Sequence, residues 1–171
     1  SESVTAALFF NDVAHTDDPE MFCRMLSAAF TEMGGVIRTC HVQAIQQDSQ
    51  GTCLFHEQGK LQFDALVVAT GAWSKRLLAP LGYKVPLDTE RGYHLKLTKP
   101  NPISRPVASA ERKFIMTPMS EGLRLAGTVE FAGLEAGMDP RRAEVLLPQA
   151  DALLNSTPQV AERDDAIWMS M

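Results

Sequence analysis

The sequence has few cysteines, and the three present are far apart. Cys23, Cys40 and Cys53 form no CxxC pair and no Cys/His spacing of the kind that holds zinc. An odd number of separated thiols in apolar surroundings does not predict a disulfide framework either. We therefore expect reduced, buried thiols, no metal site, and a cytoplasmic location.

Long apolar runs and basic clusters are also missing. No run approaches the roughly 18 to 20 residues of a transmembrane helix, and no basic region followed by an apolar stretch opens the sequence. The net charge is -5, and no cluster of five or more Lys or Arg occurs. We expect neither a membrane span nor a nucleic-acid partner, while peripheral attachment to the inner membrane through an electron acceptor stays open.

What the sequence does contain is typical of a folded protein. Of its 171 residues, 45% are hydrophobic and 22% charged, which excludes disorder and allows one sizeable core or two small ones.

The first part of the sequence predicts a strand over residues 1–10 and then a helix. Asp18 and Pro19 supply a helix N-cap and a proline for the first turn, and Gly34-Gly35 ends the pattern. Large apolar residues recur at helical spacing between these signals, so we expect them to pack into the core. They are Met21, Phe22, Met25, Leu26, Ala29, Phe30 and Met33.

A small antiparallel meander is predicted next. Its strands cover residues 36–46, 53–56 and 60–63. Residues 65–69 are instead continuously apolar and β-branched, which is typical of a strand buried on both faces of a parallel sheet. A helix over residues 74–81, closed by Gly82, follows.

From residue 82 onward, alternating patterns predict mainly antiparallel strands. These cover residues 85–88, 91–98, 107–110, 114–118, 123–129 and 166–171. Asp139-Pro140 opens a further helix, which Pro148 should bend. The fold class expected is therefore α/β (α+β).

The segment after the predicted parallel strand carries the strongest sign of function. Ala69-Thr70-Gly71 places small residues at the carboxyl end of a sheet, where α/β proteins bind ligands. The helix that begins near Ser74 can direct N–H groups at a phosphate. A purely structural turn is the alternative.

An ordered set of segments resembles the D-amino acid oxidase-like (DAO) family of FAD-dependent oxidoreductases, in its D-amino acid dehydrogenase and glycine oxidase branch. The segments are residues 9–10, 15–19, the helix to Gly34-Gly35, the meander with Val42 and Ile45, and residues 64–74, 81–87, 91–94, 118–119 and 122–130.

The resemblance implies a division into domains. Residues 1–18 would enter from the substrate domain, residues 19–81 would form the middle of the FAD-binding domain, and residues 82–171 would belong to the antiparallel substrate domain. No GxGxxG fingerprint occurs, and the resemblance places it upstream of Ser1. Residues 168–171 resemble the lead-in to a Trp-x-x-x-Arg-Pro segment, whose arginine binds the substrate carboxylate.

The resemblance also implies contacts with FAD. Ala69, Thr70 and Gly71 would face the cofactor, Val42 would meet the adenine through its backbone, and Trp73 would wall the flavin pocket. Ordinary core packing is the alternative for Val42 and for Trp73.

Gly92, Tyr93 and Met116 are the candidate substrate contacts. On a strand, Arg91 and Tyr93 share one face while Gly92 and His94 share the other, so only one face can line a pocket. Core packing is the alternative for Met116. We assign no catalytic side chain, and His94 is not taken as a base. The single charges Arg124 and Glu130 are expected at the surface or the pocket mouth.

The sequence therefore predicts part of an enzyme that oxidises the Cα–N bond of a D-amino acid, glycine or related secondary amine by hydride transfer to FAD. One alternative is a flavin-dependent enzyme that modifies a tRNA base. The other is a non-catalytic folding or dimerisation fragment.

Overall fold

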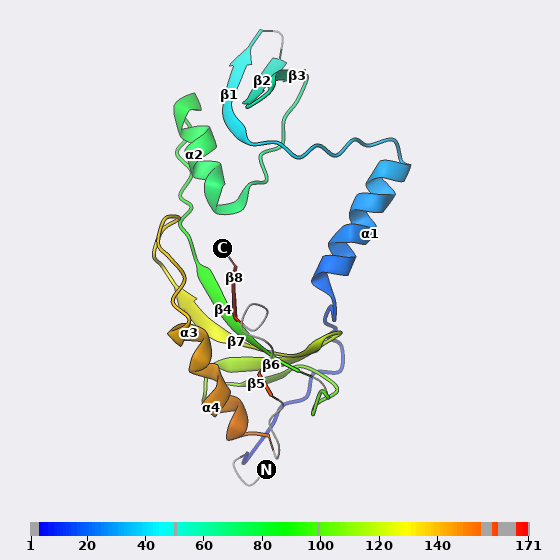
Figure 1. The fold of residues 1–171 in the computed structure, drawn as a ribbon, viewed down its shortest axis with the longest axis vertical. Coiled ribbons are helices and arrows are strands. Elements are labelled where there is room, and N and C mark those ends of the chain that lie inside the picture. Colours follow the sequence, from blue (N-terminus) through cyan, green and yellow to red (C-terminus); the bar gives the residue numbers. More distant parts are fainter. Residues whose placement is uncertain (1–3, 50, 99, 155–158, 161–166, 171) are drawn as a thin grey trace.

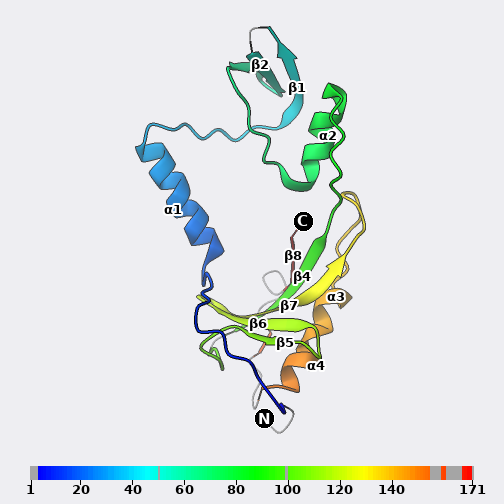
Figure 2. The same cartoon turned by 180° about the vertical axis from the view of Figure 1, so that it is seen from behind.

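The computed structural model describes residues 4–49, 51–98, 100–154, 159–160 and 167–170. A three-stranded sheet and helix α2 lie at one end of the molecule, and a five-stranded sheet with helices α3 and α4 lies at the other (Figure 1). Figure 2 shows helix α1 on one side between the two ends, with the extended segment after α2 on the other. The chain exposes 12720 Å² of surface, whereas a compact monomer of this mass exposes about 8,300 Å².

Helix α1 spans Pro19–Glu32, as the capping signals predict. The Met21 backbone N–H donates to Asp18 Oδ1 at 2.8 Å, and Pro19 occupies the first turn. Gly34 follows with φ of 92°, a left-handed conformation that ends the helix.

The prediction that the apolar face of α1 lies in the core is wrong for this chain. A helix can bury its apolar stripe only against another element, and the described residues place none there. The α1 apolar face, as we call it, is between 51% and 65% exposed at every one of its large residues: Met21, Phe22, Met25, Leu26 and Phe30.

Of the strand predicted over residues 1–10, the described part, residues 4–10, is not formed. Residues 4–10 carry no strand and pair with no described strand. The guanidinium of Arg105 lies 4.9 Å from the ring centroid of Phe9, a cation-π contact with this segment.

The predicted meander is confirmed as a three-stranded antiparallel sheet in the order β1-β2-β3. The strands are β1 (Val42–Asp48), β2 (Gly51–His56) and β3 (Gly59–Phe63). Residues 36–41 do not join it. Ile45 and Cys53 form its small buried centre.

The parallel strand predicted over residues 65–69 is not present. These residues are extended but unpaired, and Val67 is 87% exposed. A strand buried on both faces needs neighbours on each side, and the described part of the chain supplies none beside this segment.

The helix predicted over residues 74–81 is confirmed as a continuous helical stretch. It consists of a 3₁₀ turn η1 (Gly71–Trp73), the α-helix α2 (Ser74–Leu78) and a second 3₁₀ turn η2 (Ala79–Leu81). Gly82, with φ of 83°, closes it.

The second sheet is antiparallel and has the strand order β5-β6-β7-β4-β8. Its strands are β4 (Arg91–Leu97), β5 (Val107–Ser109), β6 (Phe114–Met119), β7 (Gly122–Glu130) and β8 (Ile167–Ser170). Each falls where the alternating pattern predicts it. Residues 85–88, also predicted as a strand, are not one, because they pair with no described strand.

The main core lies between one face of this sheet and helices α3 (Arg141–Glu144) and α4 (Leu146–Asp151). It consists of Leu95, Leu97, Phe114, Met116, Leu123, Leu125, Leu146 and Ala150. The helix that Pro148 is expected to bend or interrupt is divided at Val145, one turn before that proline. Pro148 lies in the first turn of α4, where its missing N–H has no helical partner to lose.

Candidate functional site

The predicted cofactor turn, residues 69–71, is exposed and open. Gly71 has φ of 53°, and a Cβ built there meets no atom within 4 Å. Thr70 Oγ1 lies 3.0 Å from Ser74 Oγ, which ties the turn to the start of α2. The turn therefore offers small side chains and free space, as a bulky ligand such as a flavin nucleotide requires.

Trp73 and Val42 lie in the same part of the molecule as this turn. Trp73 is an exposed residue at the end of η1, and half-buried Val42 begins β1, opposite His56. Strand β1 contacts helix α2, so the five residues predicted to hold the cofactor belong to one structural unit. Their contacts with FAD stay predictions.

The three predicted substrate residues are not brought together. Tyr93 and Met116 are only 1% and 2% exposed and lie on the sheet face that α3 and α4 cover. Gly92 lies on the opposite face. One pocket cannot be lined by all three, because neighbouring residues of a strand point to opposite faces.

Tyr93 and Arg91 instead belong to a buried polar network behind the sheet. The Tyr93 hydroxyl donates to Glu130 Oε2 at 2.7 Å and accepts from the Asp139 backbone N–H at 3.1 Å. Arg91 donates to the carbonyls of Gly133 and Gly137 at 2.6 and 3.3 Å. The sequence pattern did not reveal this network, because single charges such as Glu130 are expected at the surface or the pocket mouth. Alternation along β4 is the signal that places Arg91 and Tyr93 on one face.

The other face of the sheet, which we call the open face, is not covered by α3 or α4. Strand alternation places Gly92, His94 and Lys96 of β4 on it, with Arg124 of β7 beside them. Burial, together with the positive charge of Arg124, lowers the pKa of His94 to about 4. His94 is therefore a neutral imidazole at physiological pH.

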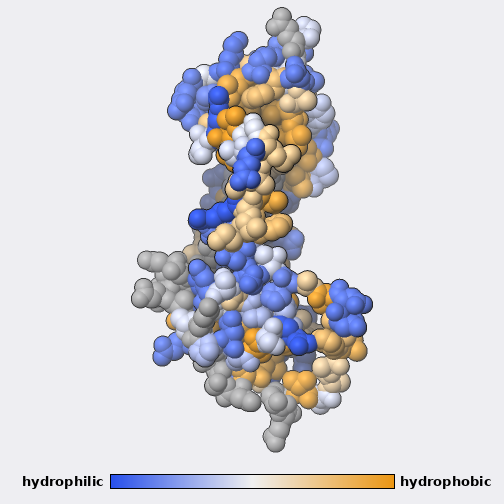
Figure 3. All heavy atoms as spheres, turned by 90° about the vertical axis from the view of Figure 1, so that its right-hand side faces the viewer, coloured by the Kyte–Doolittle hydropathy of each residue, from blue (hydrophilic) through white to orange (hydrophobic). Residues whose placement is uncertain are grey.

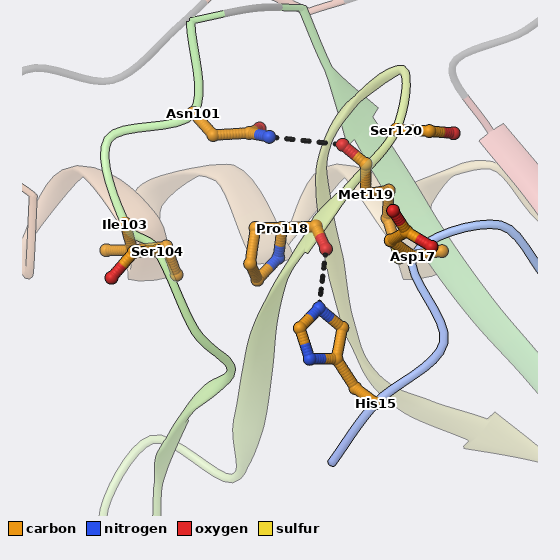
Figure 4. Close-up of a pocket in the computed structure, with 8 residues that line it drawn as sticks. All are labelled: His15, Asp17, Asn101, Ile103, Ser104, Pro118, Met119 and Ser120. Atoms are coloured by element: carbon orange, nitrogen blue, oxygen red, sulfur yellow. Dashed lines mark hydrogen bonds between the residues drawn. The ribbon is translucent and has the colours of Figure 1, made fainter.

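A separate cleft of about 520 Å³ lies beside the turn between β6 and β7 (Figure 4). None of the predicted site residues lines it. His15 Nε2 donates to the Pro118 carbonyl at 3.1 Å, and Asn101 Nδ2 donates to the Met119 carbonyl at 3.1 Å. These side chains already bind backbone, so they fasten residues 15–17 and the loop at Asn101 to the sheet.

Among the described residues, no three His, Cys, Asp or Glu side chains are grouped so that they could hold a metal ion. Within the same ranges, no helix is both long enough and apolar enough to cross a bilayer.

Curated relatives match this chain over much of its length. D-amino-acid oxidase of Bradyrhizobium diazoefficiens is 41% identical over 104 residues, which cover 60% of this chain and 25% of the relative. D-amino acid dehydrogenase of Dechloromonas aromatica is 33% identical over 71% of this chain and 30% of the relative. D-amino acid dehydrogenase of Vibrio cholerae is 31% identical over 88% of this chain and 37% of the relative. The chain thus spans a quarter to somewhat over a third of these relatives.

Solved structures share the fold. Glycine oxidase from Geobacillus kaustophilus superposes with a TM-score of 0.72 at 23% identity, over 86% of this chain and 40% of that one. Iminodiacetate oxidase from Chelativorans sp. BNC1 superposes with a TM-score of 0.65 at 18% identity, over 86% of this chain and 42% of that one. The α/β fold class is confirmed.

The family model DAO, described as FAD dependent oxidoreductase, matches residues 1–171. A match along the whole sequence agrees with the ordered segments and with the relatives. The cofactor of this family is FAD, for which the open turn at residues 69–71 has room. The chain therefore belongs to the DAO family of FAD-dependent oxidoreductases.

Proposed function

We propose that the full-length protein containing this chain oxidises the Cα–N bond of a D-amino acid, glycine or a related secondary amine. The observation that carries the proposal is the 41% identity to a D-amino-acid oxidase, within a family match that covers the whole chain. The names of the structural neighbours, glycine oxidase and iminodiacetate oxidase, indicate the same class of amine substrate.

FAD would supply the acceptor for the hydride that leaves Cα, and hydrolysis of the resulting imine would yield a 2-oxo acid and an amine or ammonia. Residues 69–71 would hold the cofactor through their small side chains and backbone. The open face of the five-stranded sheet orients the substrate and excludes water. No side chain of this chain is assigned as a base, because a neutral amine loses the hydride without one.

The 171-residue chain by itself is proposed to be inactive. It spans at most 37% of the curated relatives considered above, and it contains no GxGxxG sequence to bind the FAD pyrophosphate. We expect no tight binding of FAD by this chain alone. Sub-micromolar quenching of flavin fluorescence by the purified chain contradicts this.

The test of the function uses the full-length protein under anaerobic conditions. We expect a yellow protein whose flavin absorbance bleaches on addition of D-alanine, glycine or N-methylglycine, and not on addition of L-alanine. A well-folded, colourless protein overturns the assignment of FAD. A yellow protein that no amine bleaches overturns the assignment of the reaction.

We further propose that the protein acts in the cytoplasm on small molecules and has no nucleic-acid partner. The three free cysteines, one of them buried, suit a reducing compartment. The net charge of -5 opposes binding to a phosphate backbone.

A further inference from the structure

Basic side chains gather on the open face of the five-stranded sheet. Lys96 of β4 and Arg124 of β7 are direct cross-strand partners. His94 lies two residues before Lys96 on the same face, close enough to Arg124 for that charge to lower the pKa of the imidazole. Two like charges directly opposite one another destabilise a sheet unless another group offsets them.

The acidic side chains that the structure describes nearby do not supply that offset for Arg124. Glu121 forms an ion pair with Lys96. Glu130, the other acid at the ends of β7, lies on the helix-covered face and is bound to Tyr93 and Arg142. In the part of the chain that the structure describes, Arg124 forms no ion pair, and its Nε is buried without a hydrogen-bond partner.

The Nε of Arg91 is likewise buried without a hydrogen-bond partner, so the two arginines differ at their terminal nitrogens. Both arginines belong to central strands of one sheet, but the terminal nitrogens of Arg91 donate to two carbonyls and face the carboxylate of Glu130. A guanidinium donor left without a partner in a partly buried place costs free energy. Such a cost is offset when a ligand supplies the missing acceptor.

We propose that Arg124, with His94 and Lys96 beside it on the open face, binds a carboxylate of the ligand. A planar guanidinium matches a carboxylate with two parallel hydrogen bonds. The neutral ring of His94 adds hydrogen-bonding capacity without a further positive charge. Gly92, on the same face of β4, has no side chain and leaves room for the rest of the ligand.

The proposal rests on the proposed function only in taking the ligand to be an amino acid or related amine. Two sources of the carboxylate fit the same chemistry. It is either the α-carboxylate of the substrate or a second carboxylate on its side chain or nitrogen substituent. The second source would make dicarboxylic amines the preferred substrates.

The test is calorimetric binding of acetate and of succinate to the full-length FAD-bound protein, with no turnover required. For Arg124→Gln we expect the dissociation constant of succinate to rise about 10- to 100-fold, as for loss of a charge-assisted pair of hydrogen bonds. An equal rise for acetate assigns Arg124 to the α-carboxylate, whereas an unchanged acetate constant assigns it to the second carboxylate.

The matched control is Arg141→Gln, since the Arg141 side chain is 84% exposed and pairs with Asp139, close to it in sequence. This variant should leave both constants unchanged. Arg124→Lys, which keeps the charge but not the planar pair of donors, should weaken succinate binding about 3- to 10-fold. If Arg124→Gln fails to fold, the binding measurement on Arg124→Lys tests the proposal in its place.

Unchanged constants in a folded Arg124 variant overturn the proposal. So does a variant that loses affinity for FAD while the remaining FAD-bound protein binds both acids normally, since Arg124 would then serve the cofactor. Because FAD content and carboxylate binding are measured without substrate oxidation, a failure here is distinct from a failure to bleach with amines.

Discussion

Arg91 and Glu130 face each other across strands β4 and β7, with the wholly buried Arg91 Nη1 at 4.0 Å from Glu130 Oε2. Glu130 also lies 3.2 Å from Arg142 Nε. One carboxylate thus serves two guanidinium groups and the Tyr93 hydroxyl. Arg91 in turn donates hydrogen bonds to the carbonyls of Gly133 and Gly137, so the network attaches this loop to the sheet.

Removing this carboxylate should destabilise the fold. We expect Glu130→Gln to lower the free energy of unfolding by about 3 kcal/mol, because Arg91 is left as a buried charge without its counter-charge. Guanidinium-induced unfolding of the full-length protein measures the shift. The control is Glu121→Gln on the other face, where the side chain is 72% exposed and a loss below about 1 kcal/mol is expected. Equal losses in both variants would show that the network adds nothing.

His94 should make stability depend on pH. Its pKa in the folded protein is about 4 against an ordinary value of 6.5, so the unfolded chain binds a proton that the folded one rejects. Stability is then complete above about pH 6.5 and falls as the pH drops towards 4. With solvent screening of this half-buried group, a loss of about 1 to 2 kcal/mol is expected.

The measurement is the melting temperature between pH 4 and 7, compared with His94→Asn. The variant lacks this titration, so its melting temperature should fall less over the same interval. NMR titration of the imidazole gives the pKa directly, and a value near 6.5 would rule out the burial that we describe.

The cofactor turn can be tested with two glycines in similar conformations. Gly71 and Gly82 have φ of 53° and 83°, and a Cβ at either meets nothing within 4 Å. Alanine at each should therefore cost about 1 kcal/mol through backbone strain alone. Only Gly71→Ala places a methyl group in the proposed FAD contact, so only it should also weaken FAD binding, by about tenfold or more. Equal FAD affinities in the two full-length variants would remove residues 69–71 from the site.

The N-cap of α1 offers a local test. Asp18→Ala should cost about 1 kcal/mol, because the Met21 N–H loses its acceptor Oδ1. Asp17→Ala removes the same charge one residue earlier but keeps the Asp17 carbonyl, which accepts from the Ser120 N–H at 2.9 Å. Thermal unfolding followed by circular dichroism should separate the two variants, and a cap that contributes nothing would leave them equal.

The α1 apolar face should make the isolated chain self-associate. Figure 3, which views the α1 side of the molecule, shows hydrophobic side chains gathered over much of the upper half. Patches of this kind mark contact surfaces. We expect Phe22→Ser with Leu26→Ser to reduce light scattering by the 171-residue chain. Arg24→Ser, on the polar side of α1, should not, and a chain that stays monomeric without any substitution contradicts the prediction.

Local signals were enough to predict the elements whose partners are close in sequence. Asp18, Pro19 and Gly34 fix the ends of α1, because capping depends only on neighbouring backbone groups. The three-stranded meander and the neighbours β5, β6 and β7 follow from alternation and from turns between adjacent strands. Alternation alone predicts β4, since its partners β7 and β8 are distant in sequence. The family could also be predicted from the sequence, because the resemblance rests on the order of short sequence segments and requires no knowledge of tertiary contacts.

The elements that need distant partners were decided by the tertiary structure. Residues 65–69 and the α1 apolar face have sequences suited to burial, but burial requires surfaces that the described chain does not supply. The roles of the charged residues were hidden for a related reason. Glu130 and Arg124 are both single charges on one strand, and only the packing of helices against one face of the sheet gives Glu130 its partners and leaves Arg124 without any in the described chain.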